Sequence, residues 1–320
     1  MDHVVETSRE TIQQGSSSFS SAARLFPLET RESAWMLYAW CRYCDDVIDG
    51  QTLGFGMKPA DASTARERLA TLTHLTEQAM GDTPPEDPVF TAFHRVVRRH
   101  DIPKRFPLEL LEGFAMDIEG RRYDTLADTL SYGYHVAGVV GVMMSMVMGV
   151  RDQPTLNRAS DLGIGFQLTN ICRDVMEDAG AGRVYLPADW LAAEGVTPET
   201  VTDPASRAGV HRVVCNLLDE ADGYYDSAVL GLQALDFRSA WAIAAARGIY
   251  RDIGRRVRRE GTEAWDQRAV VPKPRKIYLA LRGLAISART SAPMPLNRDA
   301  SRAGLWTMPE ARSAQHRHIC

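Results

Sequence analysis

The sequence QLTNICRDVMED, at residues 167–178, decides the fold that we expect for this chain. In a helix, Asn170, Asp174 and Asp178 stand at positions i, i+4 and i+8, so they drift by only about 40° per step and share one face. That face presents one amide oxygen and two carboxylates along roughly 12 Å of helix. Oxygen ligands of this kind suit Mg²⁺ or Mn²⁺, which are hard cations.

A second pair of carboxylates, Asp45 and Asp49, has the same helical spacing far away in the sequence. Such pairs also occur on solvated helix faces, but residues 33–41, just before Asp45, are apolar on nearly every side, which is typical of a buried helix. Buried carboxylates are costly unless they are paired or bound to metal. We therefore expect two acidic rows to face one cavity and to hold several Mg²⁺ or Mn²⁺ ions, with a diphosphate supplying the remaining ligands.

The composition is that of an ordinary soluble globular protein. Hydrophobic residues make up 45% and charged residues 24% of the chain, and the formal net charge of -4 gives no general attraction to nucleic acid. The 5 cysteines have no regular framework, which argues against a disulfide scaffold and favours a reducing cytoplasm. Cys41 and Cys44 have CxxC spacing without a second pair, so we interpret them as buried thiols rather than zinc ligands. The start of the chain has no basic or apolar region, so we expect no signal peptide.

Helical periodicity runs through the chain, and no alternating strand pattern accumulates. We expect helices at about residues 30–50, 64–81, 89–100, 156–179, 210–226 and 237–258, with a loop over 180–208. The predicted fold class is all-α, a single-domain multi-helix bundle around a central apolar cavity that spans residues 1–286. Residues 287–320 are rich in Ser, Ala, Pro and Arg and lack any period, so we expect a poorly ordered tail.

Residues 129–150 contain no Asp, Glu, Lys or Arg. Their length would allow a membrane span, but Tyr132, His135 and several glycines favour a helix in the protein core. The small residues Ala137 and Gly141 either leave room for a long hydrocarbon or allow close packing of two helices. The residues alone leave both interpretations open.

These motifs resemble those of the squalene/phytoene synthase family, most closely its bacterial phytoene-forming members. The most specific piece is FQLTNICRDVMEDA at residues 166–179, followed by GRVYLP at 182–187. Residues 41–49 and 132–141 support the resemblance, which extends from about residue 15 to about residue 276. It implies the isoprenoid-synthase bundle, and it implies the head-to-head condensation of two geranylgeranyl diphosphates through prephytoene diphosphate to 15-cis-phytoene in carotenoid biosynthesis.

The resemblance also implies which residues act. The implied metal ligands are Asp45, Asp49, Asn170, Asp174 and Asp178. The implied catalytic residues are Asp45, Asp49, Asp174, Asp178, Tyr132 and Arg42. The implied substrate-binding residues are Ser16, Ser18, Phe19, Tyr38, Arg42, Val136, Ala137, Gly141, Gln167, Asn170, Arg173, Arg183, Tyr185 and Tyr250. From residue type alone, Arg42 would either bind a phosphate or pair with a neighbouring Asp, and the serines would either contact a phosphate or cap a helix.

The family implies further expectations about cofactors, partners and location. We expect Mg²⁺ or Mn²⁺, no NADPH, and ATP as the activator that some family members need without consuming it. The partners that we expect are a small-molecule prenyl diphosphate, other carotenoid-pathway enzymes and the membrane surface, but no nucleic acid. The expected location is cytoplasmic with peripheral attachment to the membrane.

Three alternatives remain open at this point. A dehydrosqualene or squalene synthase that uses farnesyl diphosphate would share the motifs, a terpene cyclase would use similar acidic rows, and a helical scaffold would keep the fold without the chemistry. A basic run from Arg251 to Arg259, followed by Lys273, Arg275 and Lys276, adds a second open question. It is interpreted as a solvated face, as a device that steers diphosphates, or as a contact with anionic lipid.

Overall fold

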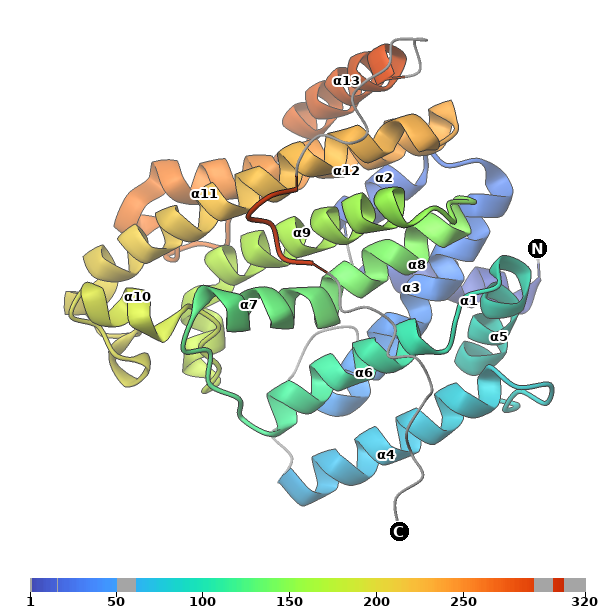
Figure 1. The fold of residues 1–320 in the computed structure, drawn as a ribbon, viewed down its shortest axis with the longest axis horizontal. Coiled ribbons are helices and arrows are strands. Elements are labelled where there is room, and N and C mark those ends of the chain that lie inside the picture. The colour runs from blue at the N-terminus through green and yellow to red at the C-terminus, as the bar shows by residue number, and fades with distance from the viewer. Residues whose placement is uncertain (1, 16, 51–61, 291–301, 308–320) are drawn as a thin grey trace.

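The computed structural model describes residues 2–15, 17–50, 62–290 and 302–307, without the side chains of residues 17–19 and 62. Every regular element within these ranges is a helix (Figure 1), which confirms the predicted all-α class. Ser16 and the side chains of Ser18 and Phe19 lie outside the described part, so the structure says nothing about these three expected substrate contacts.

Six helices form the first half of the bundle. Their bounds are α1 His3–Gly15, α2 Ser17–Ala23, α3 Leu28–Asp49, α4 Ala62–Ala79, α5 Pro88–His100 and α6 Arg105–Ile118. Helix α3 is buried against α1 and α5, as its apolar sequence predicts, and Trp40 stacks on Phe93 of α5 with ring centroids 4.1 Å apart. Gly50 ends α3 in the left-handed conformation (φ 61°), which places Asp45 and Asp49 in its last turns.

The apolar stretch at residues 129–150 is not one regular helix. It divides into α7 (Leu126–Gly133), a π-helical turn η1 (Tyr134–Gly138) and α8 (Val139–Val147). It lies inside the protein, because 72% of its most apolar 18-residue window is buried. The π turn occurs where α9 (Gln153–Gly180) touches the stretch with its backbone. A Cβ added to Gly163 of α9 would stand 2.2 Å from the carbonyl oxygen of Ala137, so only glycine fits there.

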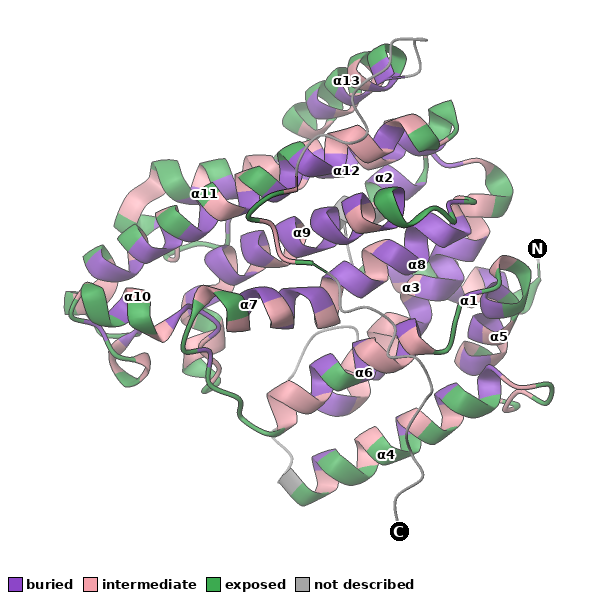
Figure 2. Cartoon of the chain, in the orientation of Figure 1, coloured by how far each residue is buried: buried purple, intermediate pink, exposed green. Residues whose placement is uncertain are grey.

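The second half of the bundle contains two long helices that cover α9. Helices α11 (Arg207–Gly231) and α12 (Phe237–Glu260) pack against it, and its burial in Figure 2 is nearly continuous. The expected loop over residues 180–208 is partly wrong, because it contains α10 (Ala188–Ala193) and two short 3₁₀ turns. Pro187, Pro198 and Pro204 stand at the starts of these elements, where a missing N–H costs nothing.

A last helix, α13 (Lys273–Thr290), was not expected from the sequence, and it continues past residue 286. Pro274 stands in its first turn, where proline is tolerated. Because Pro272 and Pro274 together are typical of a break between helices, the sequence did not indicate a helix start here. Helix α13 packs along α12, with the indole N–H of Trp241 donating to the carbonyl of Ala280 at 2.8 Å.

Residues 302–307, within the expected tail, lie against the body of the protein. The Arg302 guanidinium donates to both oxygens of Asp161, at 2.9 and 2.5 Å, and Asp161 is completely buried in α9. The backbone N–H of Trp306 donates to the Tyr224 hydroxyl at 2.9 Å, and the Trp306 ring lies 4.6 Å from that of Tyr134. This segment therefore supplies a guanidinium to a buried carboxylate that Arg158 of α9 also attracts.

The cysteines agree with a chain that does not depend on disulfides. Cys41, Cys44, Cys172 and Cys215 are all free thiols. Burial raises the pKa of the Cys41 thiol to about 12, so this thiol stays protonated. Cys44 is buried, as the sequence predicts, whereas Cys41 is half-buried.

We expect the ion pair between Arg302 and Asp161 to hold the end of the chain in place. Arg302→Ala leaves a fully buried carboxylate without its guanidinium and should lower the free energy of unfolding by about 3 kcal/mol. The measurement is urea unfolding followed by circular dichroism. Arg212→Ala is the matched control, since it removes an arginine from an exposed pair with Glu194 and should have no measurable effect. Equal stability of the two variants would contradict this role of the segment.

Candidate active site

A single large cavity runs through the middle of the described bundle. Its volume is about 580 Å³, and residues of α3, α6, η1, α8, α9, α11 and α12 line it. On α9 the lining extends from Thr155 to Arg173, a distance of roughly 27 Å along the helix axis. The lining is mostly apolar around Leu162 and becomes polar toward Arg173, so the cavity has a hydrocarbon-like part and a charged end.

The structure places most of the predicted substrate residues in this lining. These are Tyr38, Arg42, Val136, Ala137, Gly141, Gln167, Asn170, Arg173 and Tyr250. Asp45 and Tyr132 of the predicted catalytic set also line the cavity, whereas Arg183 and Tyr185 are not part of its lining. Phe166 also lines the cavity and stacks on Tyr250 with ring centroids 4.1 Å apart. The close packing of Gly163 on η1 does not fill the cavity, because Val136, Ala137 and Gly141 face it as well. The small residues of this stretch therefore do both: they allow close packing of two helices, and they line the cavity.

The acidic row of α3 lies at the charged end of the cavity and is paired with arginines. Arg42 forms an ion pair with Asp45. Asp49 accepts two hydrogen bonds from the guanidinium of Arg183, at 3.2 and 2.5 Å. Arg183 follows α9, so this pair ties the end of α3 to the end of α9 and holds the ends of the two acidic rows close together.

The acidic row of α9 is paired in a similar way. Asp174 accepts a hydrogen bond from Nε of Arg173 at 2.8 Å and one from Arg268 at 3.1 Å. Asn170 accompanies it in the same row and donates weakly to Gln167 at 3.4 Å. Burial, with the neighbouring carboxylates of Asp174 and Glu177, raises the pKa of Asp178 to about 8.

The structure does not assemble the expected metal site from these rows by itself. Among the described residues, no group of three or more His, Cys, Asp or Glu side chains converges on one point. The physical reason is that arginines already neutralise Asp45, Asp49 and Asp174. The donor set still fits Mg²⁺ or Mn²⁺, because it consists of oxygen atoms and because burial beside other carboxylates leaves Asp178 short of positive charge.

Asp117, near the end of α6, organises a cluster of tyrosines that the sequence did not predict. Its carboxylate accepts hydrogen bonds from the hydroxyls of Tyr132 at 3.0 Å and Tyr185 at 2.8 Å. The rings of Tyr132 and Tyr185 are stacked with centroids 4.5 Å apart, and Tyr123 packs against both. Burial raises the pKa of Asp117 to about 6, although Arg183 and the two hydroxyls oppose this effect. Asp117 therefore holds Tyr132 at the cavity, with Tyr185 stacked on it.

Two cations at the charged end were also missed as site residues. Arg268 and Lys276 line the cavity although they lie about a hundred residues beyond the acidic row of α9. Lys276 belongs to the basic run for which steering of diphosphates was one interpretation, whereas no local motif marks Arg268. Together with Arg42 and Arg173 they give this end of the cavity four cationic side chains, which suits a ligand with phosphate groups.

Solved structures that share this fold define the class of protein. A dehydrosqualene synthase matches with a TM-score of 0.80 and 25% identity over 89% of this chain and 97% of that one. A squalene synthase from Alicyclobacillus acidocaldarius matches with a TM-score of 0.70 and 22% identity over 81% of this chain and 94% of that one. The protein therefore has the all-α isoprenoid-synthase fold.

The sequence comparisons place the chain within this class. The model of the squalene/phytoene synthase family matches residues 12–275, and the chain belongs to that family. It is 49% identical to a 15-cis-phytoene synthase of Enterobacter agglomerans over 93% of this chain and 100% of the relative. It is 50% identical to a 15-cis-phytoene synthase of a Paracoccus strain over 97% and 99% of the two chains. The protein is thus a prenyltransferase-type enzyme of a family that acts on prenyl diphosphates.

We expect the buried carboxylate of Asp117 to reduce stability at neutral pH. Its pKa rises from the usual 3.8 to about 6 on folding, so ionising it opposes folding increasingly as the pH rises from about 4 to about 6. Asp117→Asn removes that cost and should raise the free energy of unfolding by about 1–3 kcal/mol above pH 6, with no gain below pH 4. Urea unfolding at both pH values measures the difference. Asp82→Asn, at a highly exposed carboxylate, is the control and should show no such pH dependence. A gain from Asp117→Asn that is the same at both pH values would contradict this explanation.

Proposed function

We propose that this enzyme is a 15-cis-phytoene synthase of carotenoid biosynthesis. It would condense two geranylgeranyl diphosphates head to head, through prephytoene diphosphate, to 15-cis-phytoene. The observation that carries this proposal is the identity of about half of all residues with 15-cis-phytoene synthases that the chain covers almost completely. The long apolar cavity with one charged end supports it, because the substrate has the same division into hydrocarbon and diphosphate.

The charged end of the cavity would bind the two diphosphates. Arg42, Arg173, Arg268 and Lys276 supply cationic donors there, and arginine pairs with phosphate in a bidentate geometry. Bound Mg²⁺ or Mn²⁺, held by Asp45, Asp49, Asn170, Asp174 and Asp178, would stabilise the charge that develops on the departing diphosphate. Because the arginines pair with the carboxylates in this structure, binding of substrate would require them to exchange partners.

The remaining lining would protect the allylic cation. Apolar walls from α8, α9 and α12 exclude the water that would otherwise capture it. Tyr132, Tyr38 and Tyr250 line the same cavity, and an aromatic ring face stabilises a nearby cation. Asp117 would hold Tyr132 in place through its hydroxyl and leave the ring facing the reacting carbons. Burial and the neighbouring Asp117 raise the pKa of Tyr132 far above its usual value, so its hydroxyl stays protonated.

Further parts of the proposal concern cofactors and location. The reaction consumes no reductant, so no NADPH would be needed, and ATP would act at most as an activator that is not consumed. Ser16, Ser18 and Phe19 would contact the substrate next to Gly15, which lines the cavity. The enzyme would work in the cytoplasm at the membrane surface, together with other enzymes of the pathway.

A second candidate is synthesis of dehydrosqualene from farnesyl diphosphate. The similarity of the fold to a dehydrosqualene synthase favours it, because the same cavity would hold a shorter chain. Product analysis separates the two functions. The purified enzyme receives geranylgeranyl or farnesyl diphosphate separately, with Mg²⁺ or Mn²⁺ and without NADPH. Phytoene from the first substrate, with little product from the second, is the expected result. A thirty-carbon product from farnesyl diphosphate alone would overturn the proposal in favour of dehydrosqualene synthesis.

We expect the two acidic rows to be essential for turnover. Asp45→Ala and Asp174→Ala should each lower kcat by about 10³-fold, because each removes an oxygen ligand for the divalent ions. Release of diphosphate measures turnover, and circular dichroism tests that the helices persist. Asp219→Ala is the control, because Asp219 pairs with Arg258 on the surface. Near-normal turnover in either variant would show that these rows do not bind the metal ions.

A further inference from the structure

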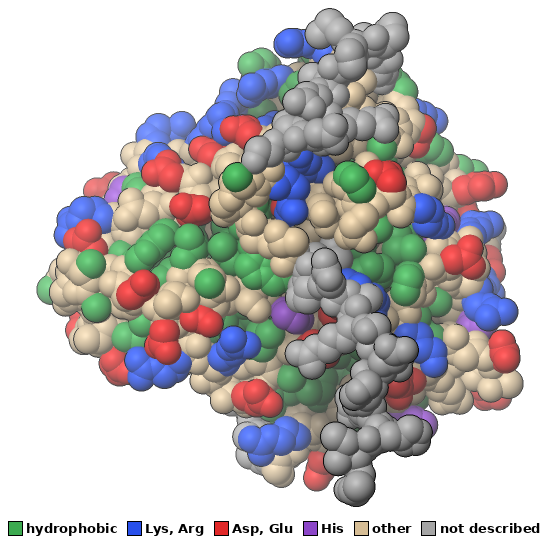
Figure 3. All heavy atoms as spheres, viewed as in Figure 1, with side chains coloured by type: hydrophobic (Ala, Val, Ile, Leu, Met, Phe, Trp, Pro, Cys, Tyr) green, Lys and Arg blue, Asp and Glu red, His purple; other side chains and the backbone are tan. Residues whose placement is uncertain are grey.

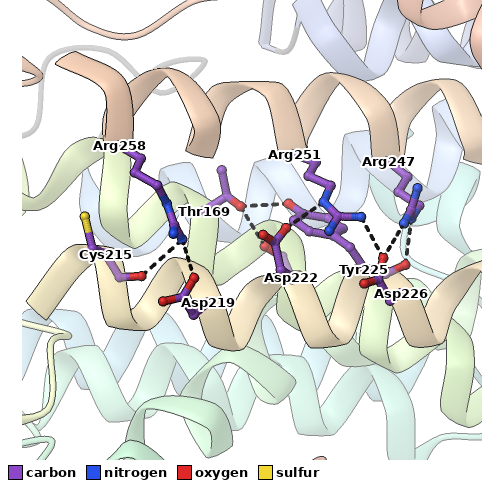
Figure 4. Close-up of polar contacts among 10 residues, drawn as sticks. Thr169, Cys215, Asp219, Asp222, Tyr225, Asp226, Arg247, Arg251 and Arg258 are labelled. Atoms are coloured by element: carbon purple, nitrogen blue, oxygen red, sulfur yellow. Dashed lines mark hydrogen bonds and ion pairs between the residues drawn. The ribbon is translucent and has the colours of Figure 1, made fainter. Parts of the chain in front are cut away.

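Lys and Arg side chains gather along the upper edge of the molecule, over α12 and α13 (Figure 3). Two arginines of the basic run on α12, together with Arg247, pair with acidic residues of α11 (Figure 4). Arg251 pairs with Asp222 and Asp226, Arg247 also pairs with Asp226, and Arg258 pairs with Asp219. This part of the edge is therefore a seam between two helices of the same protein, not a free basic face.

Helix α13 differs, because its outer surface is apolar. In the described part of the chain, large hydrophobic side chains are exposed at Leu28, Phe237, Val270, Ile277, Tyr278 and Leu281. Four of these six lie on α13 or just before it, and their exposed fractions range from 53% to 63%. Isolated exposed hydrophobic residues are ordinary, whereas a contiguous group indicates an interaction surface.

The apolar group has the spacing of one helix face. Leu279, Gly283 and Ser287 face inward, and a Cβ on Gly283 would approach the backbone of Ala245 to 2.9 Å. Ile277, Tyr278 and Leu281 face outward, and the exposed Ala285 and Ala288 continue the same stripe. The helix is thus apolar on both sides, although only its inner side has a partner in this structure. We call the outer side, with Val270, the outer stripe.

Charge around the outer stripe has one sign. Helix α13 carries Lys273, Arg275, Lys276, Arg282 and Arg289 and no acidic residue. Arg275 pairs with Asp252 of α12 and lies over the ring of Tyr278, 4.9 Å from its centroid. An apolar stripe flanked by cations is the composition of helices that lie in the interface of an anionic bilayer.

The outer stripe also reaches the cavity. Val270 is 59% exposed and lines the cavity together with Val271 and with Lys276, the residue before Ile277 in the sequence. A surface that is inserted among lipids at Ile277 and Leu281 would therefore bring one wall of the cavity to the bilayer. A long hydrocarbon could then pass between the bilayer and the cavity without crossing water, which is favourable because its exposure to water is costly.

We propose that the outer stripe of α13 docks on an anionic lipid bilayer and that it opens the cavity toward the lipid. Ile277, Tyr278 and Leu281 enter the interface, while Lys273, Arg282 and Arg289 contact the lipid phosphates. The docking surface is independent of which prenyl diphosphate is used. Its use for delivering substrate or releasing product rests on the proposed function.

Binding of the purified full-length protein to sedimented vesicles tests this surface. Vesicles of phosphatidylcholine with phosphatidylglycerol should bind the protein, and vesicles of phosphatidylcholine alone should bind it more weakly. The double variant Ile277→Glu/Leu281→Glu should lose about tenfold or more of the affinity, because two large apolar side chains no longer enter the interface. Leu28→Glu is the matched control, since Leu28 is 57% exposed and Leu281 is 59% exposed. This control should bind like the unchanged protein.

Two further measurements make the outcome decisive. The double variant should keep its helicity and its turnover of detergent-dispersed substrate, because neither side chain lines the cavity. Lys273→Gln/Arg282→Gln should weaken binding to the anionic vesicles and reduce its dependence on salt. Equal vesicle binding by the double variant and the Leu28→Glu control would overturn the proposal. A second result would also overturn it. If light scattering showed that the unchanged protein is a dimer, that the double variant is a monomer, and vesicle binding were the same for both, the occupant of the stripe would be a second copy of the chain. Vesicle binding needs no substrate, so an error in the proposed reaction would appear in product analysis alone.

Discussion

The close contact between the backbone of α9 and the π-helical turn is the constraint on which the rest of the site depends. Gly163 lies against the carbonyl of Ala137, and Gly141 similarly leaves no space for a Cβ beside the carbonyl of Ala159. This contact fixes α9 relative to η1 and α8, and both sides of the seam then supply walls of the cavity. The π turn widens the helix at this point, and such turns are frequent at functional sites. Packing and cavity formation thus arise from the same residues.

Charge compensation between carboxylates and guanidinium groups is the second constraint on the site. Asp45, Asp49 and Asp174 all lie beside guanidinium groups, which come from α3, from the turn after α9 and from the segment before α13. These pairs let the bundle keep acidic rows at a buried surface whose isolated charges would be costly. The same arginines are suited to bind diphosphate. The internal ion pairs of the site therefore resemble the contacts expected with substrate.

The two ends of the cavity are stabilised in different ways. Near the start of α9, Asp161 is neutralised by Arg302 from the end of the chain, and its neighbour Ser227 donates to the same carboxylate. At the charged end, the segment from Arg268 to Lys276 forms part of the wall and leads into α13. Two segments from the last part of the chain thus contribute to the two ends, and only the segment with Arg302 lies in the region that has the composition of a tail.

The sequence by itself determined the all-α class, the positions of most long helices and the two acidic rows, because helical periodicity and i, i+4 spacing are local properties. Nine of the residues that the family motifs single out as substrate contacts line the cavity. Tertiary structure alone decided the pairing of Asp49 with Arg183, the role of Asp117 beneath Tyr132 and Tyr185, and the outward face of α13. These features join residues from distant segments, and nothing in the local sequence states which side of a helix will be covered. The break in the helix at residues 134–138 follows the same rule, because its cause, the approach of Gly163, lies on another helix.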